Sequence, residues 1–136
     1  MKTIFDCAII PMDKFVNSQG KLTEIKSEDS IPFPINRVIY MYGVPDGVSR
    51  GAHAHKQGYQ LVIAAGGSFD ILLDDGKNKK IVRLSQPNYG LLVVPGIWRD
   101  LSDFSSGAVC LVLASHTYKD TSTITDYEEF KQFKNM

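Results

Sequence analysis

The chain has 136 residues, of which 43% are hydrophobic and 22% are charged, and its 15 Lys and Arg residues balance 15 Asp and Glu residues. This composition is typical of one globular domain, and the zero net charge argues against a nucleic-acid or membrane surface, because both favour a basic excess. Two cysteines are too few for a disulfide framework. The N-terminus lacks the apolar run of a signal peptide, and no stretch has the length of a membrane span. We therefore expect a single cytoplasmic domain over residues 1–136.

Short apolar runs between frequent Gly and Pro residues predict an all-β fold. The expected strands are Lys21–Lys26, Arg37–Tyr42, His55–Ala64, Gly67–Leu73, Lys79–Leu84, Gly90–Val94, Arg99–Phe104 and Ala108–Ala114. Turns are expected at Asn17–Gly20, Gly66–Gly67 and Asp75–Gly76, where glycine tolerates a positive φ. Phe69, Ile71 and Leu73 alternate with polar residues and predict one buried face. Many short strands in one domain indicate a sandwich or barrel of the jelly-roll type.

The C-terminal segment is the one stretch that predicts a helix. Thr125 and Glu128 match a capping box, and Tyr127, Phe130 and Phe133 recur at helical spacing. We expect this helix to pack on the outside of the β domain.

The run Arg50-Gly51-Ala52-His53-Ala54-His55-Lys56 carries the clearest chemical signal. On a strand, His53 and His55 lie on the same face with Cα atoms roughly 6.5 Å apart. Two imidazoles facing one cavity bind a metal, or move protons near neutral pH. A simple structural role at a strand start is the alternative, but the neighbouring Arg50, Lys56 and Tyr59 favour an anion-binding site that moves protons.

A metal site is not supported by the residues around the pair. Metal-binding cupins follow His-x-His with a Glu and, later, with a His after a turn that resembles Pro-x-Gly. Here no carboxylate follows His55 before Gln60, and Pro95-Gly96-Ile97-Trp98-Arg99 places an arginine where the last ligand is expected. Because Arg99 would repel a cation, and His116 lies in a loop-like stretch, we expect no bound metal.

Several motifs together resemble the cupin-type sugar 3,4-ketoisomerases, which act on a dTDP-linked 4-keto-6-deoxyhexose. The run from Arg50 to Lys56 resembles their Arg-Gly-x-His-Ala-His-Lys signature. The other matching segments are Ile31–Val38, Leu72–Gly76, Gly90–Leu91, Pro95, Trp98, Asp103–Ser106, Val112–Ser115, Tyr127 and Phe130. The similarity extends from about Phe15 to Phe133. The resemblance implies a double-stranded β-helix (the cupin jelly roll), a homodimer, a sugar-nucleotide site in the barrel, and no metal or organic cofactor.

The resemblance also implies roles for individual residues. The reaction moves a carbonyl from C4 to C3 through an enediol, with His53 as the principal base and His55 as a second proton carrier. The residues expected to contact the substrate are Arg37 and Arg50 at the diphosphate, Tyr40 and Arg99 at the sugar oxygens, and Tyr59, Trp98 and Gln19 around the pocket. Arg99 favours the product with an equatorial C4 hydroxyl, and Gln19 occupies the place of its partner in that distinction. Ile39, Gln19 and Tyr59 depart from the family pattern.

Two alternatives remain open. One is an enzyme like dTDP-4-dehydrorhamnose 3,5-epimerase, a related and longer cupin that moves protons on the same substrate. The other is a non-catalytic module that binds a nucleotide sugar, which the departures at Ile39, Gln19 and Tyr59 favour.

Overall fold

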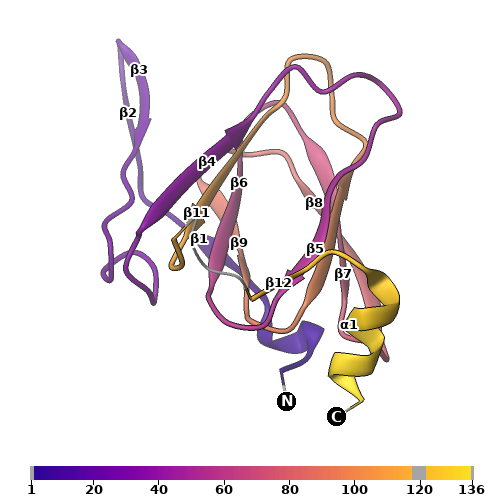
Figure 1. Cartoon of the computed structure of the whole chain (residues 1–136). Coiled ribbons are helices and arrows are strands. Elements are labelled where there is room, and N and C mark those ends of the chain that lie inside the picture. The colour runs from indigo at the N-terminus through magenta and orange to yellow at the C-terminus, as the bar shows by residue number, and fades with distance from the viewer. Residues whose placement is uncertain (1, 118–121, 136) are drawn as a thin grey trace.

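The computed structural model describes residues 2–117 and 122–135, whose strands form two five-stranded antiparallel sheets that face each other (Figure 1). The first sheet has the order β1 (Ala8–Pro11), β9 (Tyr89–Val93), β6 (Gln60–Gly66), β11 (Val109–Ala114) and β4 (Arg37–Met41). The second has the order β12 (Thr123–Ile124), β5 (Arg50–His55), β10 (Trp98–Ser102), β7 (Phe69–Asp74) and β8 (Lys79–Leu84). A short 3-10 helix (Ile4–Asp6), a separate hairpin of β2 (Lys14–Asn17) and β3 (Gly20–Thr23), and the helix α1 (Tyr127–Lys134) complete the fold. The predicted all-β fold with a C-terminal helix is confirmed.

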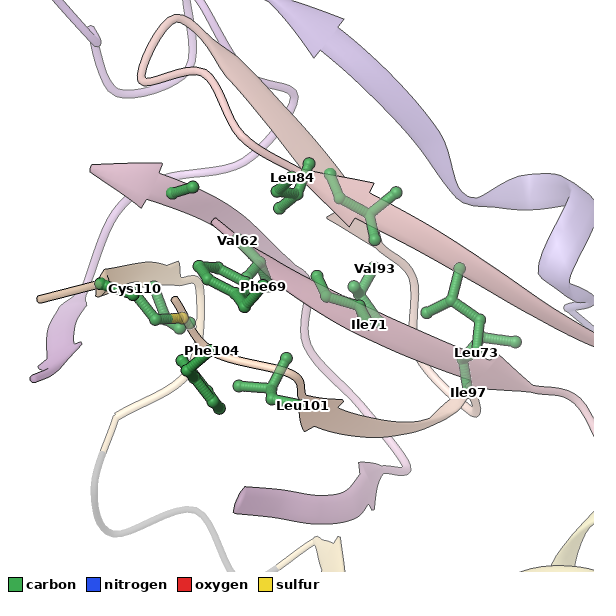
Figure 2. Close-up of a cluster of buried hydrophobic side chains, with 14 of the residues drawn as sticks. Val62, Phe69, Ile71, Leu73, Leu84, Val93, Ile97, Leu101, Phe104 and Cys110 are labelled. Carbon is green, nitrogen blue, oxygen red and sulfur yellow. The ribbon is translucent and has the colours of Figure 1, made fainter. Parts of the chain in front are cut away.

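The hydrophobic core fills the space between the two sheets (Figure 2). Phe69, Ile71 and Leu73 of β7 are 0 to 1% exposed, which confirms the predicted alternation. Phe69 stacks on Phe104 with ring centroids 5.3 Å apart, and Cys110 of β11, which lies between β6 and β4, is fully buried. Each buried side chain of this size contributes about 1.5–3 kcal/mol, so this core accounts for much of the stability of the barrel.

One predicted strand is wrong, and the difference shapes the site. Instead of a continuous strand over His55–Ala64, β5 ends at His55 and β6 begins at Gln60 in the other sheet. Gly58, with φ +96°, lies in the left-handed region and allows the chain to change sheets within four residues. The reversal brings Gln60 next to the histidines.

The helix α1 forms where predicted, but its N-cap is Asp126 rather than Thr125. The Asp126 side chain accepts a hydrogen bond from the backbone N–H of Glu128. Phe130 is fully buried against Trp98, with ring centroids 5.6 Å apart, so the helix packs on the outer face of the second sheet as expected. None of the helices in the described ranges is long and apolar enough to cross a membrane.

A β-bulge at Gly51 sets the orientation of the β5 side chains. Arg99 of β10 pairs with His53, but Leu101 pairs with Arg50, so β5 has one extra residue between these two points. Gly51 has φ +73°, and a Cβ added there would lie 3.6 Å from Leu101 and 3.9 Å from Arg99. Beyond the bulge, His53 and His55 face the interior while Ala54 packs beneath α1.

A candidate active site around two histidines

His53 and His55 bring their ring nitrogens together inside the barrel. Their Nε2 atoms are 3.1 Å apart, and the rings meet edge to face with centroids 4.8 Å apart. The two residues are separated by one position on β5, so their side chains lie on the same face of the strand. A contact of this length between two ring nitrogens requires a proton on one of them.

Arg99 determines which ring nitrogen of the pair is bare, that is, carries no proton. Its Nη2 lies 3.2 Å from His53 Nε2, and a guanidinium carries only donors, so His53 Nε2 must accept. Arg99 is 3% exposed, and its Nε and Nη1 have no hydrogen-bond partner among the described residues. Leaving such donors buried and unpaired costs about 1–3 kcal/mol each. A bound oxyanion would satisfy them.

The surroundings of His53 also keep its imidazole neutral, which is the form that can accept a proton. Burial, together with the nearby charges of Arg99, His116 and Arg37, lowers the pKa of His53 to about 4. Burial likewise lowers the pKa of Arg99 to about 10, which still leaves the guanidinium charged at neutral pH. At that pH the pair is therefore a neutral imidazole beside a fixed cation.

His55 has three further neighbours that the sequence did not predict. Its Nε2 is 3.1 Å from Gln60 Nε2, and its Nδ1 is 3.1 Å from the hydroxyl of Thr123. The ring of His116 lies on that of His55 with centroids 4.1 Å apart. A Cβ at Gly58 would come within 2.7 Å of His116 Nδ1, so the glycine leaves the space that His116 occupies. The ring of His55 is thus held on both nitrogens and on one face.

These three neighbours belong to different elements. Gln60 opens β6, His116 follows β11, and Thr123 lies in the two-residue strand β12 that pairs with β5. A signal for Gln60 was present, since an amide at the start of an otherwise apolar run is unusual in a buried strand. Nothing in the local pattern indicated Thr123 or His116, because their position depends on pairing between distant segments.

The structure places two more of the predicted site residues near the barrel interior. Arg37 begins β4 and is close enough to His53 for its charge to lower the pKa of that histidine. Tyr59 lies in the turn between β5 and β6 and stacks on Phe33 with ring centroids 6.1 Å apart. Tyr59 therefore packs within the hydrophobic clusters beside the site.

The other four predicted residues are not brought to the histidines within this chain. Arg50 is exposed beyond the bulge, and Tyr40 is 63% exposed on the opposite face of β4 from Arg37. Trp98 lies on the outer face of β10 under α1, because adjacent residues of a strand point to opposite faces. Gln19 is at the exposed turn of the hairpin β2–β3, which stands apart from the barrel (Figure 1).

Within residues 2–117 and 122–135, no group of three or more His, Cys, Asp or Glu side chains is arranged to hold a metal ion. The bare nitrogen of His53 instead faces the guanidinium of Arg99. The geometry suits proton transfer next to a developing negative charge.

Comparison with known proteins decides the family. The sequence model of the family described as "FdtA: WxcM-like, C-terminal" matches residues 5–135. The chain belongs to this WxcM-like family. The match includes every residue of the site described above, together with the hairpin and α1.

Relatives of the WxcM-like chain match it over nearly their whole length, and those with solved structures share its fold. A protein of Aneurinibacillus thermoaerophilus, named TDP-4-oxo-6-deoxy-alpha-D-glucose-3,4-oxoisomerase, is 38% identical over 125 residues, which are 92% of this chain and 90% of the relative. The crystal structure of a 3,4-ketoisomerase from Helicobacter canadensis has a TM-score of 0.93 and 40% identity, and covers 96% of this chain and 98% of its own. QdtA of Thermoanaerobacterium thermosaccharolyticum, a sugar 3,4-ketoisomerase solved with TDP, has a TM-score of 0.94 and 35% identity, with 98% and 97% covered.

Proposed function

We propose that this protein is a sugar-nucleotide 3,4-ketoisomerase that converts dTDP-4-keto-6-deoxyglucose to a dTDP-3-keto-6-deoxyhexose without a metal or organic cofactor. The observation that carries the proposal is the bare Nε2 of His53, held between the donor Nη2 of Arg99 and a second imidazole at 3.1 Å. The family and its named 3,4-ketoisomerase relatives support the reaction class. The same Thermoanaerobacterium enzyme has also been solved, as a mutant, with TDP-4-keto-6-deoxyglucose.

The first half of the reaction removes the proton on C3. His53 Nε2 takes this proton, and the electron pair of the C3–H bond becomes the C3=C4 double bond while negative charge develops on O4. The guanidinium of Arg99, with Nε and Nη1 unpaired in the described structure, is the group that stabilises that charge. Positioned proton transfer contributes on the order of 10²–10⁴-fold to the rate.

The second half returns the proton. The hydroxyl proton of O3 moves to O4, so that C3 becomes the carbonyl, and His53 delivers its proton to C4. No proton or electron is gained or lost over the cycle. His55, which is 3.1 Å from His53, is the available carrier between the two oxygens.

The diphosphate requires cations, and arginine suits phosphate oxygens because its donors form a planar fork. Arg37, whose charge already acts on His53, is the diphosphate ligand that this chain supplies next to the site. We further propose that the product has an equatorial C4 hydroxyl, as expected for an arginine at position 99. A large H4–H5 coupling in the proton NMR spectrum of the product would support this configuration, and a small one would contradict it.

We also propose that the enzyme is a homodimer of single cupin domains, each comprising residues 1–136, and that it acts in the cytoplasm. The hairpin β2–β3 exposes Phe15, Val16 and Leu22, at 56, 63 and 59%, although an isolated two-stranded hairpin is marginal in water. A second copy packed on these side chains would remove them from solvent. It would also allow Gln19, at the tip of the hairpin, to reach the active site of the second copy. Gln19 does not reach the active site of its own chain. The free thiols of Cys7 and Cys110 suit a reducing compartment.

Turnover of dTDP-4-keto-6-deoxyglucose by the purified protein, followed by proton NMR, tests the function. The wild type is expected to move the carbonyl to C3, and His53→Asn is expected to lose this activity while still binding dTDP in calorimetry. A product epimerised at C3 or C5 with its C4 carbonyl retained would indicate the epimerase alternative. Binding of dTDP without turnover by the wild type would indicate the non-catalytic module.

A further inference from the structure

The third histidine of the chain, His116, lies directly on the ring of His55. The ring centroids are 4.1 Å apart, the two planes are inclined at 44°, and His116 is 8% exposed. His55 ends β5 and His116 follows β11, so the two rings meet between strands of different sheets. The fold thus gathers all three histidines of the chain in one cluster.

The backbone around His116 is built to hold its ring in this place. The N–H of Ser115 donates to the carbonyl of Tyr59 at 3.0 Å, and the N–H of Tyr59 donates to the Ser115 hydroxyl at 2.8 Å. The residue before His116 is therefore tied to the turn between β5 and β6. Gly58, in the same turn, has φ +96°, and a Cβ there would lie 2.7 Å from His116 Nδ1 and 3.3 Å from its Cβ. A side chain at position 58 and the ring at position 116 would compete for the same space.

The orientation of the His55 ring decides its contact with His53. Because Arg99 donates to His53 Nε2, the proton in the 3.1 Å contact between the two rings lies on His55 Nε2. His55 Nδ1 is then bare and accepts a hydrogen bond from the hydroxyl of Thr123, 3.1 Å away. Rotation about the Cβ–Cγ bond would break both contacts, and this torsion is only loosely restricted in histidine. A ring packed on the face of the His55 imidazole opposes such a rotation.

Resting on the function proposed above, we propose that His116 is a positioning residue whose ring fixes the imidazole of His55, so that the Nε2–H of His55 points at His53 Nε2. His116 fills the space that Gly58 leaves beside this imidazole. Without the His116 ring, His55 would have room to turn away from His53. A misplacement of about 1 Å in a catalytic group costs on the order of 100-fold in rate. The role depends on the shape of the His116 ring and requires no proton transfer by it.

His116 also acts on His53 through its charge, and this effect has to be separated from packing. The charge of His116 lowers the pKa of His53 by less than burial and Arg99 do, and by more than Arg37 does. His116→Phe keeps a flat ring at this position and removes the charge, whereas His116→Ala removes both. The two variants therefore form a matched pair.

Turnover of dTDP-4-keto-6-deoxyglucose by the two variants tests the proposal. We expect His116→Ala to lower kcat by about tenfold or more with KM within about threefold, because the effect is on the geometry of the reacting groups. His116→Phe should keep kcat within about threefold of the wild type. The proposal is overturned if the two variants agree in kcat within about twofold.

Gly58→Ala approaches the same contact from the other side. The added Cβ must displace the His116 ring, whereas the strain of the positive φ is present with or without that ring. In a double-mutant cycle, Gly58→Ala should lower kcat about tenfold in the wild type and less than about twofold in the His116→Ala background. Equal losses in the two backgrounds would overturn the proposal.

NMR spectra of the histidine rings report the state of His55 without any turnover. Nitrogen–proton correlations identify which ring nitrogen carries the proton. We expect the Nε2–H form of His55 in the wild type and in His116→Phe, and a mixture of both tautomers in His116→Ala. A single Nε2–H form in His116→Ala would overturn the proposal. If the spectra are as expected but the wild type has no turnover, the proposed function is overturned instead.

Discussion

The low pKa of His53 can be tested by substituting Arg99 and measuring the pKa of the His53 ring by NMR. Its pKa of about 4 lies well below the ordinary value of 6.5, which corresponds to about 3 kcal/mol in favour of the neutral form. Burial is the largest cause and the charge of Arg99 is the second, so Arg99 accounts for less of this energy than burial does. Arg99→Met should therefore raise the pKa of His53 only part of the way towards 6.5.

The assay is a pH titration of the histidine ring signals in the wild type, Arg99→Met and Arg99→Lys. The lysine variant retains a positive charge and should leave the pKa of His53 low, which separates the effect of charge from that of lost packing. The reasoning is refuted if His53 of the wild type titrates near 6.5, or if the methionine and lysine variants titrate alike. The kcat/KM of the wild type should stay level with falling pH until well below 6.5, because it reports the free enzyme.

The same pKa has a consequence for stability. Because the folded pKa of His53 is below the unfolded value, the unfolded chain binds more protons between about pH 4 and 6.5. The contribution of this group to the free energy of unfolding therefore rises with pH across that window and is level above it. Denaturant unfolding of wild type and His53→Asn should show a steeper dependence on pH in the wild type, and parallel curves would contradict the assignment.

Three more changes test other parts of the structure. Gly51→Ala should lower the free energy of unfolding by about 1 kcal/mol or more, measured by urea denaturation, because the position has φ +73°; an unchanged midpoint would count against the bulge. Trp98→Ala should cost about 3–5 kcal/mol of stability but leave the affinity for dTDP unchanged in calorimetry, because Trp98 packs under α1; weaker binding in the folded variant would restore its predicted contact with substrate. Leu22→Asp should shift light-scattering mass from dimer to monomer, because Leu22 is 59% exposed on the hairpin proposed to pair with a second copy; an unchanged dimer would place the interface elsewhere.

The sequence predicted those features of the fold that depend on local pattern. The alternation of Phe69, Ile71 and Leu73 and the turn at Asp75–Gly76 correspond directly to β7 and to the hairpin that joins it to β8. The predicted strand over His55–Ala64 was wrong because the chain changes sheets in the mostly polar stretch between His55 and Gln60. That change depends on Gly58 adopting a positive φ, and a glycine alone does not reveal its conformation.

For the site, the sequence located the histidine pair, and the contact with Arg99 followed only from pairing between β5 and β10. Trp98 and Arg99 are adjacent in sequence, yet one lies under the helix and the other beside His53. The register of the strand decides between them, and a single sequence gives no direct measure of register. Thr123 could not be predicted from the sequence for the same reason, because β12 is two residues long and is defined by its pairing with β5.

For His53 as the proposed base, the position of Arg99 accounts for proton uptake by a group of such low pKa. A histidine with a pKa near 4 has little affinity for a proton, because it is buried and because it lies beside the charge of Arg99. When negative charge develops on O4 and lies against the free donors of Arg99, the field of the guanidinium at His53 is largely cancelled. The proton affinity of His53 then rises as the proton is being taken from C3, and it falls again as the charge on O4 is neutralised. A single buried arginine would in this way couple stabilisation of the enediolate to the strength of the base that forms it.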